Sequence, residues 1–181
     1  MAIQTVEPLV KNVKYEGRFL RFVEAGGWEY VERTKVSGIV VILAVTPENK
    51  MIFVEQYRPP IASLCLEIPA GLAGDIVGQE LEALEIAASR ELLEETGYQA
   101  DTMTYLTHGA SSAGLCTEIV TFFRAEGLKK VTLGGGDASE QINVIEVPLN
   151  EVADWLQKRI SGGAYVDFKV YTALFFALQK A

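Results

Sequence analysis

The sequence predicts an α/β fold, on three observations. Apolar runs rich in β-branched residues, such as 38–46, are typical of buried strands and recur along the chain. Residues 78–96 place apolar side chains at helical spacing and end at a glycine. Residues 149–160 and 165–180 predict two further helices. Strands interrupted by few helices, without an internal repeat, indicate one domain with a small N-terminal appendage.

Composition and charge narrow the class of protein. The 181 residues are 49% hydrophobic, which is ample for one core, and no apolar run approaches the ~18 residues of a membrane span. The first fourteen residues lack a secretory signal pattern, and Cys65 and Cys116 show neither metal-ligand nor disulfide spacing, so we expect a reducing cytoplasm. A net charge of −8 argues against a nucleic-acid partner. A polyphosphate substrate would need metal ions or placed arginines.

The first element is a β-hairpin. The segments 18–24 and 28–35 have strand composition and flank a turn at residues 25–27. A hairpin alone is marginally stable, so it is expected to pack on the domain or on a second subunit. Trp28 could stack on a base and Arg33 could fork onto a phosphate, although packing is the favoured role for this segment taken alone.

Strands are expected next at 38–46, 51–57 and 65–68. Arg58 ends the second of these before two prolines, which fix the exit path of the chain. A loop rich in glycine then opens at Pro69-Ala70-Gly71 and leads into the helix. Such a loop can bring backbone groups close to a ligand, and flexibility is the alternative reading.

The helix of residues 78–96 ends in an acidic cluster. Glu91, Glu94 and Glu95 lie within five residues, and a helical wheel places Glu95 inside the apolar stripe formed by residues 81, 84, 88 and 92. A carboxylate in a core-facing stripe is costly unless it is paired or binds a metal. The negative pole of the helix dipole is also a poor place for acids. This arrangement indicates a hard cation held by oxygen ligands.

The remainder of the chain predicts strands at 102–107, 118–125 and 142–147. Residues 126–141 are expected to form a long polar loop containing Glu140. Loops of this length are commonly functional, and a functional Glu140 is favoured over the alternative of a solvated loop acid.

Residues 90–98 resemble the Nudix box, whose pattern is G-x5-E-x7-R-E-U-x-E-E-x-G-U, with U a bulky aliphatic residue. Arg90 through Gly97 match every fixed position, Tyr98 stands at the last bulky one, and Glu82 has the required spacing to Arg90. Ten residues separate Gly71 from Glu82 where the pattern has five, which we interpret as an extension of the loop.

Other segments resemble one branch, the ADP-ribose and nucleoside-diphosphate-sugar pyrophosphatases. These segments are 28–33 (WEYVER), 55–58 (EQYR), 67–71 (EIPAG) and 139–144 (SEQINV). One departure concerns a Ser-Pro-Gly motif followed by a Glu, which is here Ser112-Ala113-Gly114 and Glu118. Ala113 in place of proline weakens the case for strict ADP-ribose specificity.

The resemblance implies a Nudix α/β/α sandwich around a mixed sheet, with residues 1–36 as an antiparallel β segment exchanged in a homodimer and 37–181 as the hydrolase domain. It implies Mg²⁺ or Mn²⁺ bound by the Ala70 carbonyl, Glu91, Glu94 and Glu95. Arg90 would orient a carboxylate, and Glu140 would act as a general base or further ligand. The residues expected to contact a nucleoside-diphosphate-sugar substrate are Trp28, Tyr30, Arg33, Arg58, Glu67, Gly71, Ser112 and Glu118.

Two alternatives remain at this point. One is a Nudix pyrophosphatase for dinucleoside polyphosphates, NADH or coenzyme A. The other is a non-catalytic nucleotide-sensing module, although such modules often lose the box carboxylates that this chain retains.

Overall fold

The structure, a computed structural model, describes residues 9–136 and 141–179. The described strands are β1 (Asn12–Glu16), β2 (Leu20–Ala25), β3 (Trp28–Arg33), β4 (Gly38–Ala44), β5 (Lys50–Arg58), β6 (Ser63–Glu67), β7 (Ala70–Ala73), β8 (Tyr98–Gln99), β9 (Thr102–Ala110), β10 (Ile119–Glu126), β11 (Lys129–Lys130), β12 (Asn143–Pro148) and β13 (Tyr165–Val166). The described helices are α1 (Leu84–Thr96), α2 (Val152–Ser161) and α3 (Phe168–Leu178), with 3-10 turns at Pro59–Ile61 and Leu149–Glu151.

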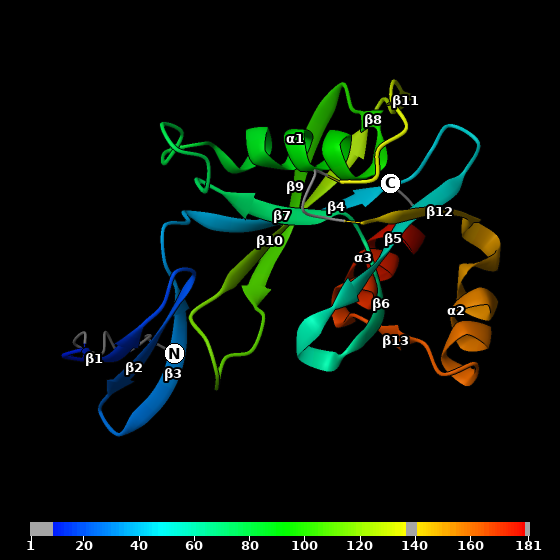
Figure 1. Cartoon of the computed structure of the whole chain (residues 1–181). Helices are drawn as coiled ribbons and strands as arrows, with labels where there is room; N and C mark the ends of the chain where they lie inside the picture. The colour runs from blue at the N-terminus through cyan, green and yellow to red at the C-terminus, as the bar shows by residue number, and fades with distance from the viewer. Residues whose placement is uncertain (1–8, 137–140, 180–181) are drawn as a thin grey trace, which may run out of the picture.

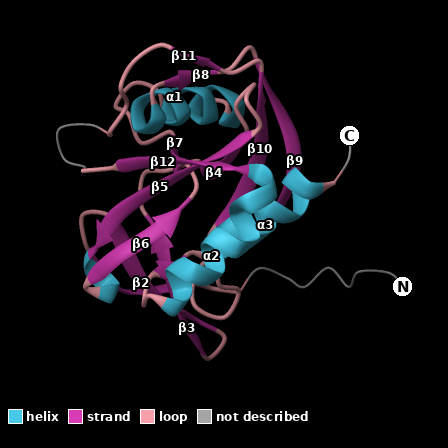
Figure 2. Cartoon of the chain, turned by 90° about the vertical axis from the view of Figure 1, so that its right-hand side faces the viewer, coloured by secondary structure: helices cyan, strands magenta, loops and turns pink. Residues whose placement is uncertain are grey.

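Two four-stranded sheets form the centre of the molecule, in the orders β7-β4-β10-β9 and β12-β5-β6-β13. The β4–β10 and β6–β13 pairs are parallel and the other pairs in these sheets are antiparallel. Helix α1 lies on one side of the strands, and α2 and α3 lie on the other (Figures 1 and 2). The expected α/β/α sandwich with mixed strands is confirmed.

Strand β4 shows why both faces of the sheet are covered. Its side chains are almost all apolar, and successive residues point to opposite faces. Val40 and Ile42 pack in the core cluster that contains Leu92 of α1. Val41 and Leu43 pack in the cluster that also holds residues of α2 and α3. The side chains of β4 therefore pack in both core clusters, and those in the first cluster hold α1 against one face of the sheet.

The N-terminal strands form a separate antiparallel sheet in the order β1-β2-β3. Figure 1 shows it in blue, projecting beside the start of β10. Strands β2 and β3 replace the expected segments 18–24 and 28–35, and β1 adds a strand that the sequence analysis did not include. Backbone hydrogen bonds join Val31 to Leu115 and Thr117 and so tie this sheet to the loop before β10.

The start expected for the acidic helix was wrong. α1 begins at Leu84 rather than near residue 78, and Leu81 is 96% exposed instead of lying in the buried stripe. Gly78 has a φ of +87°, which a helix does not accommodate, and Ala83 is extended. The side chain of Glu82, which precedes the helix, also accepts a hydrogen bond from Arg90 of α1 at 3.1 Å.

Other expected boundaries also change. The closing helix begins at Phe168, not at residue 165, because residues 165–166 pair with β6 and Asp167 caps the helix by accepting the Lys169 N–H at 2.8 Å. The segment 149–151 forms a 3-10 turn before α2. The loop expected over 126–141 contains β11, which pairs with β8. Residues 70–73, expected as loop, form β7 against β4, and strand β9 continues to Ala110.

Among the described residues, no helix is both long enough and apolar enough to cross a membrane.

Candidate functional site

Helix α1 holds the acidic cluster because its apolar face is fixed against the sheet. Ala87, Ala88 and Leu92 are fully buried there, and Gly97 ends the helix with a φ of +73° while its N–H donates to the Leu93 carbonyl at 2.8 Å. Because this face of α1 packs against the sheet, Glu95 on the same face is also buried, at 3% exposure, as the helical wheel predicted.

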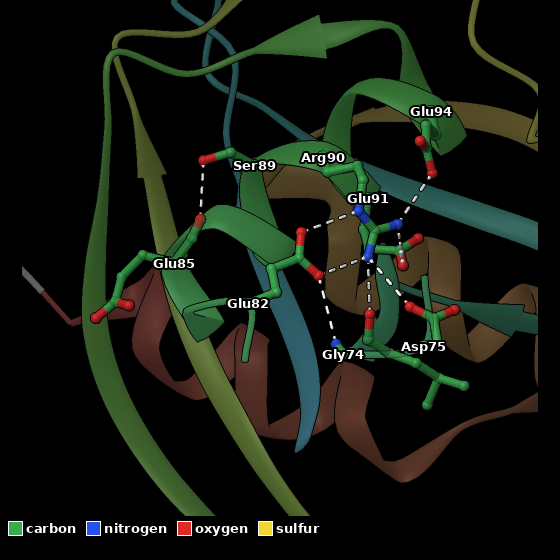
Figure 3. A network of polar contacts seen from close by, with 9 residues as sticks. Gly74, Asp75, Glu82, Glu85, Ser89, Arg90, Glu91 and Glu94 are labelled. Atoms are coloured by element: carbon green, nitrogen blue, oxygen red, sulfur yellow. Dashed lines mark hydrogen bonds and ion pairs between the residues drawn. The ribbon is translucent and has the colours of Figure 1, made fainter. Parts of the chain in front are cut away.

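Arg90 lies at the centre of a polar network on this helix (Figure 3). Its Nη1 donates to Glu91 Oε1 at 2.9 Å and to Glu94 Oε2 at 3.3 Å. Its Nη2 donates to the Leu72 carbonyl at 2.9 Å. The guanidinium thus holds two carboxylates of the cluster to one side and the strand β7 to the other.

Glu82 belongs to the same network despite the longer loop before it. Its two carboxylate oxygens accept from Arg90 Nε at 3.2 Å and Nη2 at 3.1 Å, and its side chain is only 3% exposed. The hydrogen bonds from Arg90 lower the pKa of the Glu82 carboxyl. Asp75 adds a weaker ion pair to Arg90 at 3.5 Å. The five additional residues between Gly71 and Glu82 therefore do not prevent the contact between Glu82 and Arg90, whose spacing in sequence is that of the pattern.

Glu91 packs directly on Gly71. A Cβ added to Gly71 would lie 1.9 Å from Glu91 Cδ, so only glycine leaves room for this carboxylate. The Glu91 side chain is 12% exposed, and burial raises its pKa to about 7. Gly71 therefore lets a carboxylate sit against the backbone of β7.

Glu95 reaches the same strand from the next turn of the helix. Its Oε2 accepts the Ala70 N–H at 3.1 Å, which brings Ala70 beside the acidic cluster. Glu94 points outward, with a side chain that is 48% exposed. The three glutamates and Ala70 therefore line the junction of α1 and β7.

This donor set fits a hard cation. Across residues 9–136 and 141–179, no three His, Cys, Asp or Glu side chains converge into a ready-made metal site, because Arg90 lies between Glu91 and Glu94. The available donors are nevertheless all oxygens, and the space at Gly71 brings a carboxylate against the backbone. Carboxylate and carbonyl oxygens are the ligands that Mg²⁺ and Mn²⁺ prefer.

A cavity of about 270 Å³ opens beside Ala70, Gly71 and Glu95. Two ion pairs line it. Arg58 donates to both carboxylate oxygens of Glu67 at 2.5 and 2.7 Å, and burial of Glu67 is nearly complete. In the second pair, Arg33 Nε donates to Glu118 Oε1 at 2.6 Å. Each arginine is therefore held in a fixed orientation by an acid.

The expected aromatic residues lie elsewhere. Trp28 and Tyr30 line a separate, more apolar cavity of about 390 Å³ on the N-terminal sheet. A third cavity of about 230 Å³ shares Arg33 and Glu118 with the site and Thr117 with the aromatic cavity. The predicted residues thus form two groups joined by Arg33 and Glu118 at the base of β10.

The residues that line the site differ from the predicted set at a few positions. Ser112 lines none of these cavities; its carbonyl accepts backbone N–H groups of the following turn. Its neighbour Ser111 lines the site instead and donates to Glu118 at 3.1 Å. Lys169 at the start of α3 also lines the site, and only its fold position could have revealed it. Glu140 lies outside the described residues.

Comparisons of the sequence and the structure with known proteins show what this chain is similar to. A sequence profile of the NUDIX domain matches residues 35–166. The chain is 38% identical over 146 residues to the "Methanol dehydrogenase activator" of Bacillus methanolicus, covering 80% of this chain and 74% of that protein. It is 39% identical over 132 residues to the "ADP-ribose pyrophosphatase" of Bacillus subtilis (strain 168), covering 71% of this chain and 67% of that protein.

A "GDP-mannose pyrophosphatase" of Yersinia enterocolitica is 32% identical over 147 residues, covering 76% of this chain and 74% of that protein. A solved structure described as "ADP compounds hydrolase" superposes with a TM-score of 0.64 over 86% of both chains. At 21% identity, that structure supports the fold alone.

Proposed function

The chain belongs to the NUDIX domain family and is a Nudix hydrolase, and on that premise we propose that it is a pyrophosphatase of nucleoside diphosphate sugars. The favoured substrate is ADP-ribose, and the products are a nucleoside monophosphate and a sugar phosphate. The observation that carries this proposal is the cavity in which two oriented arginines face the acidic end of α1. A diphosphate needs both cationic side chains and a metal site beside them.

In this proposal Mg²⁺, or Mn²⁺ in its place, is held by the Ala70 carbonyl and the carboxylates of Glu91, Glu94 and Glu95. When bound, the cation offsets the charge of the diphosphate and lowers the pKa of water. Arg90 orients Glu91 and Glu94 through the hydrogen bonds described above, as a positioning residue.

Glu140 is proposed as the general base that takes a proton from the attacking water, or as an additional ligand. This role rests on the sequence, in which Glu140 lies in a segment similar to the late motif of the branch.

Arg58 and Arg33 are proposed to bind the phosphates or the terminal ribose, since a guanidinium forks onto phosphate oxygens. Glu67 and Glu118 keep the two arginines aligned. Gly71 lines the same cavity beside Glu91 and is proposed to contact the substrate through its backbone.

The base is assigned to the cavity lined by Trp28 and Tyr30, because aromatic side chains stack on nucleobases. The intermediate cavity at Arg33 supports a continuous path between the two halves of the substrate. Ala113, directly after Ser112 in the loop before β10, lines the aromatic cavity, and alanine in place of proline there is proposed to favour a broader specificity.

We further propose that residues 1–36 form a dimerisation segment and residues 37–181 the hydrolase domain. The N-terminal sheet leaves large apolar side chains uncovered, including Trp28 and Phe19 at 64% exposure and Tyr15 at 70%. A second copy would cover them, and exchange of the segment would place aromatic residues of one subunit near the site of the other.

A second candidate is supported by the relative named "Methanol dehydrogenase activator", which is as similar to this chain as the pyrophosphatase relative is and whose name mentions no pyrophosphatase activity. This candidate is the alternative that the sequence left open: a Nudix pyrophosphatase for NADH or another nucleotide, or a chain that binds a nucleotide without hydrolysis.

A substrate panel separates these candidates. ADP-ribose, ADP-glucose, GDP-mannose, NADH, coenzyme A and a dinucleoside polyphosphate are incubated with Mg²⁺ and with EDTA, and the products are identified by mass spectrometry. Mg²⁺-dependent release of a nucleoside monophosphate from the sugar nucleotides supports the proposal. Faster cleavage of NADH or another dinucleotide supports the second candidate, and binding without any cleavage refutes both enzymatic readings.

A further inference from the structure

The glycine triplet at residues 134–136 lies against the C-terminal end of α1, where Glu94 and Glu95 are located. The last carbonyls of a helix have no partner within the helix and must find other donors. Here Gly136 N–H donates to the Glu94 carbonyl at 3.1 Å, and Gly135 N–H donates to the Glu95 carbonyl at 2.8 Å. The peptide groups of two proposed cation ligands are thus fixed by one loop.

The same segment closes the rest of the helix end. Lys130 Nζ donates to the Thr96 carbonyl at 2.7 Å, and the N–H groups of Val131 and Thr132 donate to the Gly97 carbonyl at 2.8 and 3.1 Å. Figures 1 and 2 both show β11, which precedes these residues, beside α1 and β8. Residues 130–136 therefore wrap the helix terminus with donors on successive carbonyls.

Glycine is required at the tightest points of this contact. A Cβ on Gly134 would lie 2.3 Å from the Thr96 carbonyl carbon and 2.8 Å from the Glu95 oxygen. A Cβ on Gly97 would lie 2.2 Å from the Thr132 oxygen. Gly134, Gly135 and Gly136 also have φ values of +71°, +112° and +82°, which L-residues with side chains rarely adopt. Two backbones interlock here, and neither can retreat without breaking the hydrogen bonds.

This contact addresses the electrostatic problem of placing acids at the negative pole of a helix dipole. Donors on the Glu94 and Glu95 carbonyls reduce the partial negative charge next to the two carboxylates. Glu95 is then held at both ends, by Gly135 through its carbonyl and by the Ala70 N–H through its carboxylate. Glu94, whose side chain is half exposed, is fixed through its backbone.

We propose that residues 134–136 are a positioning element that pre-orients Glu94 and Glu95 for a divalent cation. The inference rests on the proposed cation site and adds to it the backbone loop on which the geometry of two ligands depends. The glycines act through the glutamates and do not themselves contact substrate.

The test compares Gly134→Ala with Gly163→Ala in the full chain. Gly163 also has a positive φ, of +88°, but a Cβ there would meet nothing within 4 Å, so it controls for backbone strain alone. Mn²⁺ affinity is measured by electron paramagnetic resonance titration without substrate. Loss of groups that orient metal ligands commonly weakens metal binding about 10–100-fold, and we expect at least about tenfold for Gly134→Ala and less than about twofold for Gly163→Ala.

Gly135→Ala is the second variant in case Gly134→Ala does not fold. A Cβ at Gly135 would come no closer than 3.9 Å to the Ile142 oxygen, so only the φ of +112° opposes it, and a smaller loss of affinity is expected. Hydrogen exchange of the Gly135 and Gly136 amides reports the contact independently and should be slow in the wild type. Wild-type protein that binds no Mn²⁺ overturns the proposed cation site. Wild-type affinity in the folded glycine-loop variants, or rapid exchange of the two amides, overturns the positioning role alone.

Discussion

Replacing Glu82 by glutamine isolates the contact between the extended loop and the acidic helix. Glutamine keeps the size of the side chain and one oxygen acceptor, and it removes the charge that faces Arg90. Because the Glu82 side chain is only 3% exposed, its pair with Arg90 is poorly screened by water.

The expected loss of stability is about 1–3 kcal/mol, since hydrogen bonds to charged groups contribute about 1.5–3 kcal/mol and a glutamine retains part of one. The larger losses of ~3–5 kcal/mol seen when a buried charge is stranded should not occur. Arg90 keeps its contacts with Glu91, Glu94 and the Leu72 carbonyl in the variant.

Urea unfolding in EDTA, at pH 7 and in acid, measures this difference. Arg90 lowers the pKa of Glu82 in the folded state, so the stabilisation is complete above the unfolded pKa and is lost as pH falls through the folded pKa. The wild type and Glu82→Gln should therefore differ fully above about pH 5 and converge as the pH falls below about 4. Glu85→Gln, which changes an exposed acid in the first turn of α1, serves as the control and should change stability less. A difference of less than ~0.3 kcal/mol at neutral pH, or one that grows in acid, would exclude a stabilising ion pair between Glu82 and Arg90.

Three further predictions concern the acidic residues of the site and the two cysteines. Glu94→Gln and Glu95→Gln should each lower kcat at least ~10²-fold while circular dichroism shows a retained fold; near-normal turnover by either variant would contradict the metal-site assignment. Glu140→Gln should lower kcat more than it raises KM in steady-state kinetics, and a large rise in KM with unchanged kcat would exclude its proposed role. Burial raises the pKa of the Cys65 thiol to about 11, so iodoacetamide at pH 8 should modify the partly exposed Cys116 first, as mapped by peptide mass spectrometry; preferential labelling of Cys65 would contradict its burial.

Much of the fold was predictable because the signals were local. The continuous apolar run of strand β4 and the stop at Gly97 depend on residues that are neighbours in sequence. The burial of Glu95 followed from helical geometry alone. Each of these features can be predicted from the residues of a single helix or strand.

The start of α1 was not predictable in the same way. Its apolar pattern continues back to Leu81, but the contact of Glu82 with Arg90 and the left-handed Gly78 override that pattern. Tertiary contacts of this kind outweigh local propensity.

The partners of the site arginines depended on distant pairings. Arg33 meets Glu118 across 85 positions of sequence because β3 and the start of β10 are joined by backbone hydrogen bonds at Val31. Lys169 reaches the site from the last helix for a similar reason, through the pairing of β13 with β6. The sequence suggested that the arginines contact ligand, whereas the acids that orient them needed the fold.

Hydrolysis of ADP-ribose in ¹⁸O-labelled water, with Mg²⁺ and with EDTA, tests directly whether this chain splits a diphosphate at a metal site. We expect Mg²⁺-dependent formation of one nucleoside monophosphate and one sugar phosphate, with a single ¹⁸O atom in one of the two products. Absence of these products across ADP-ribose, ADP-glucose and GDP-mannose, or equal turnover in EDTA, would contradict it.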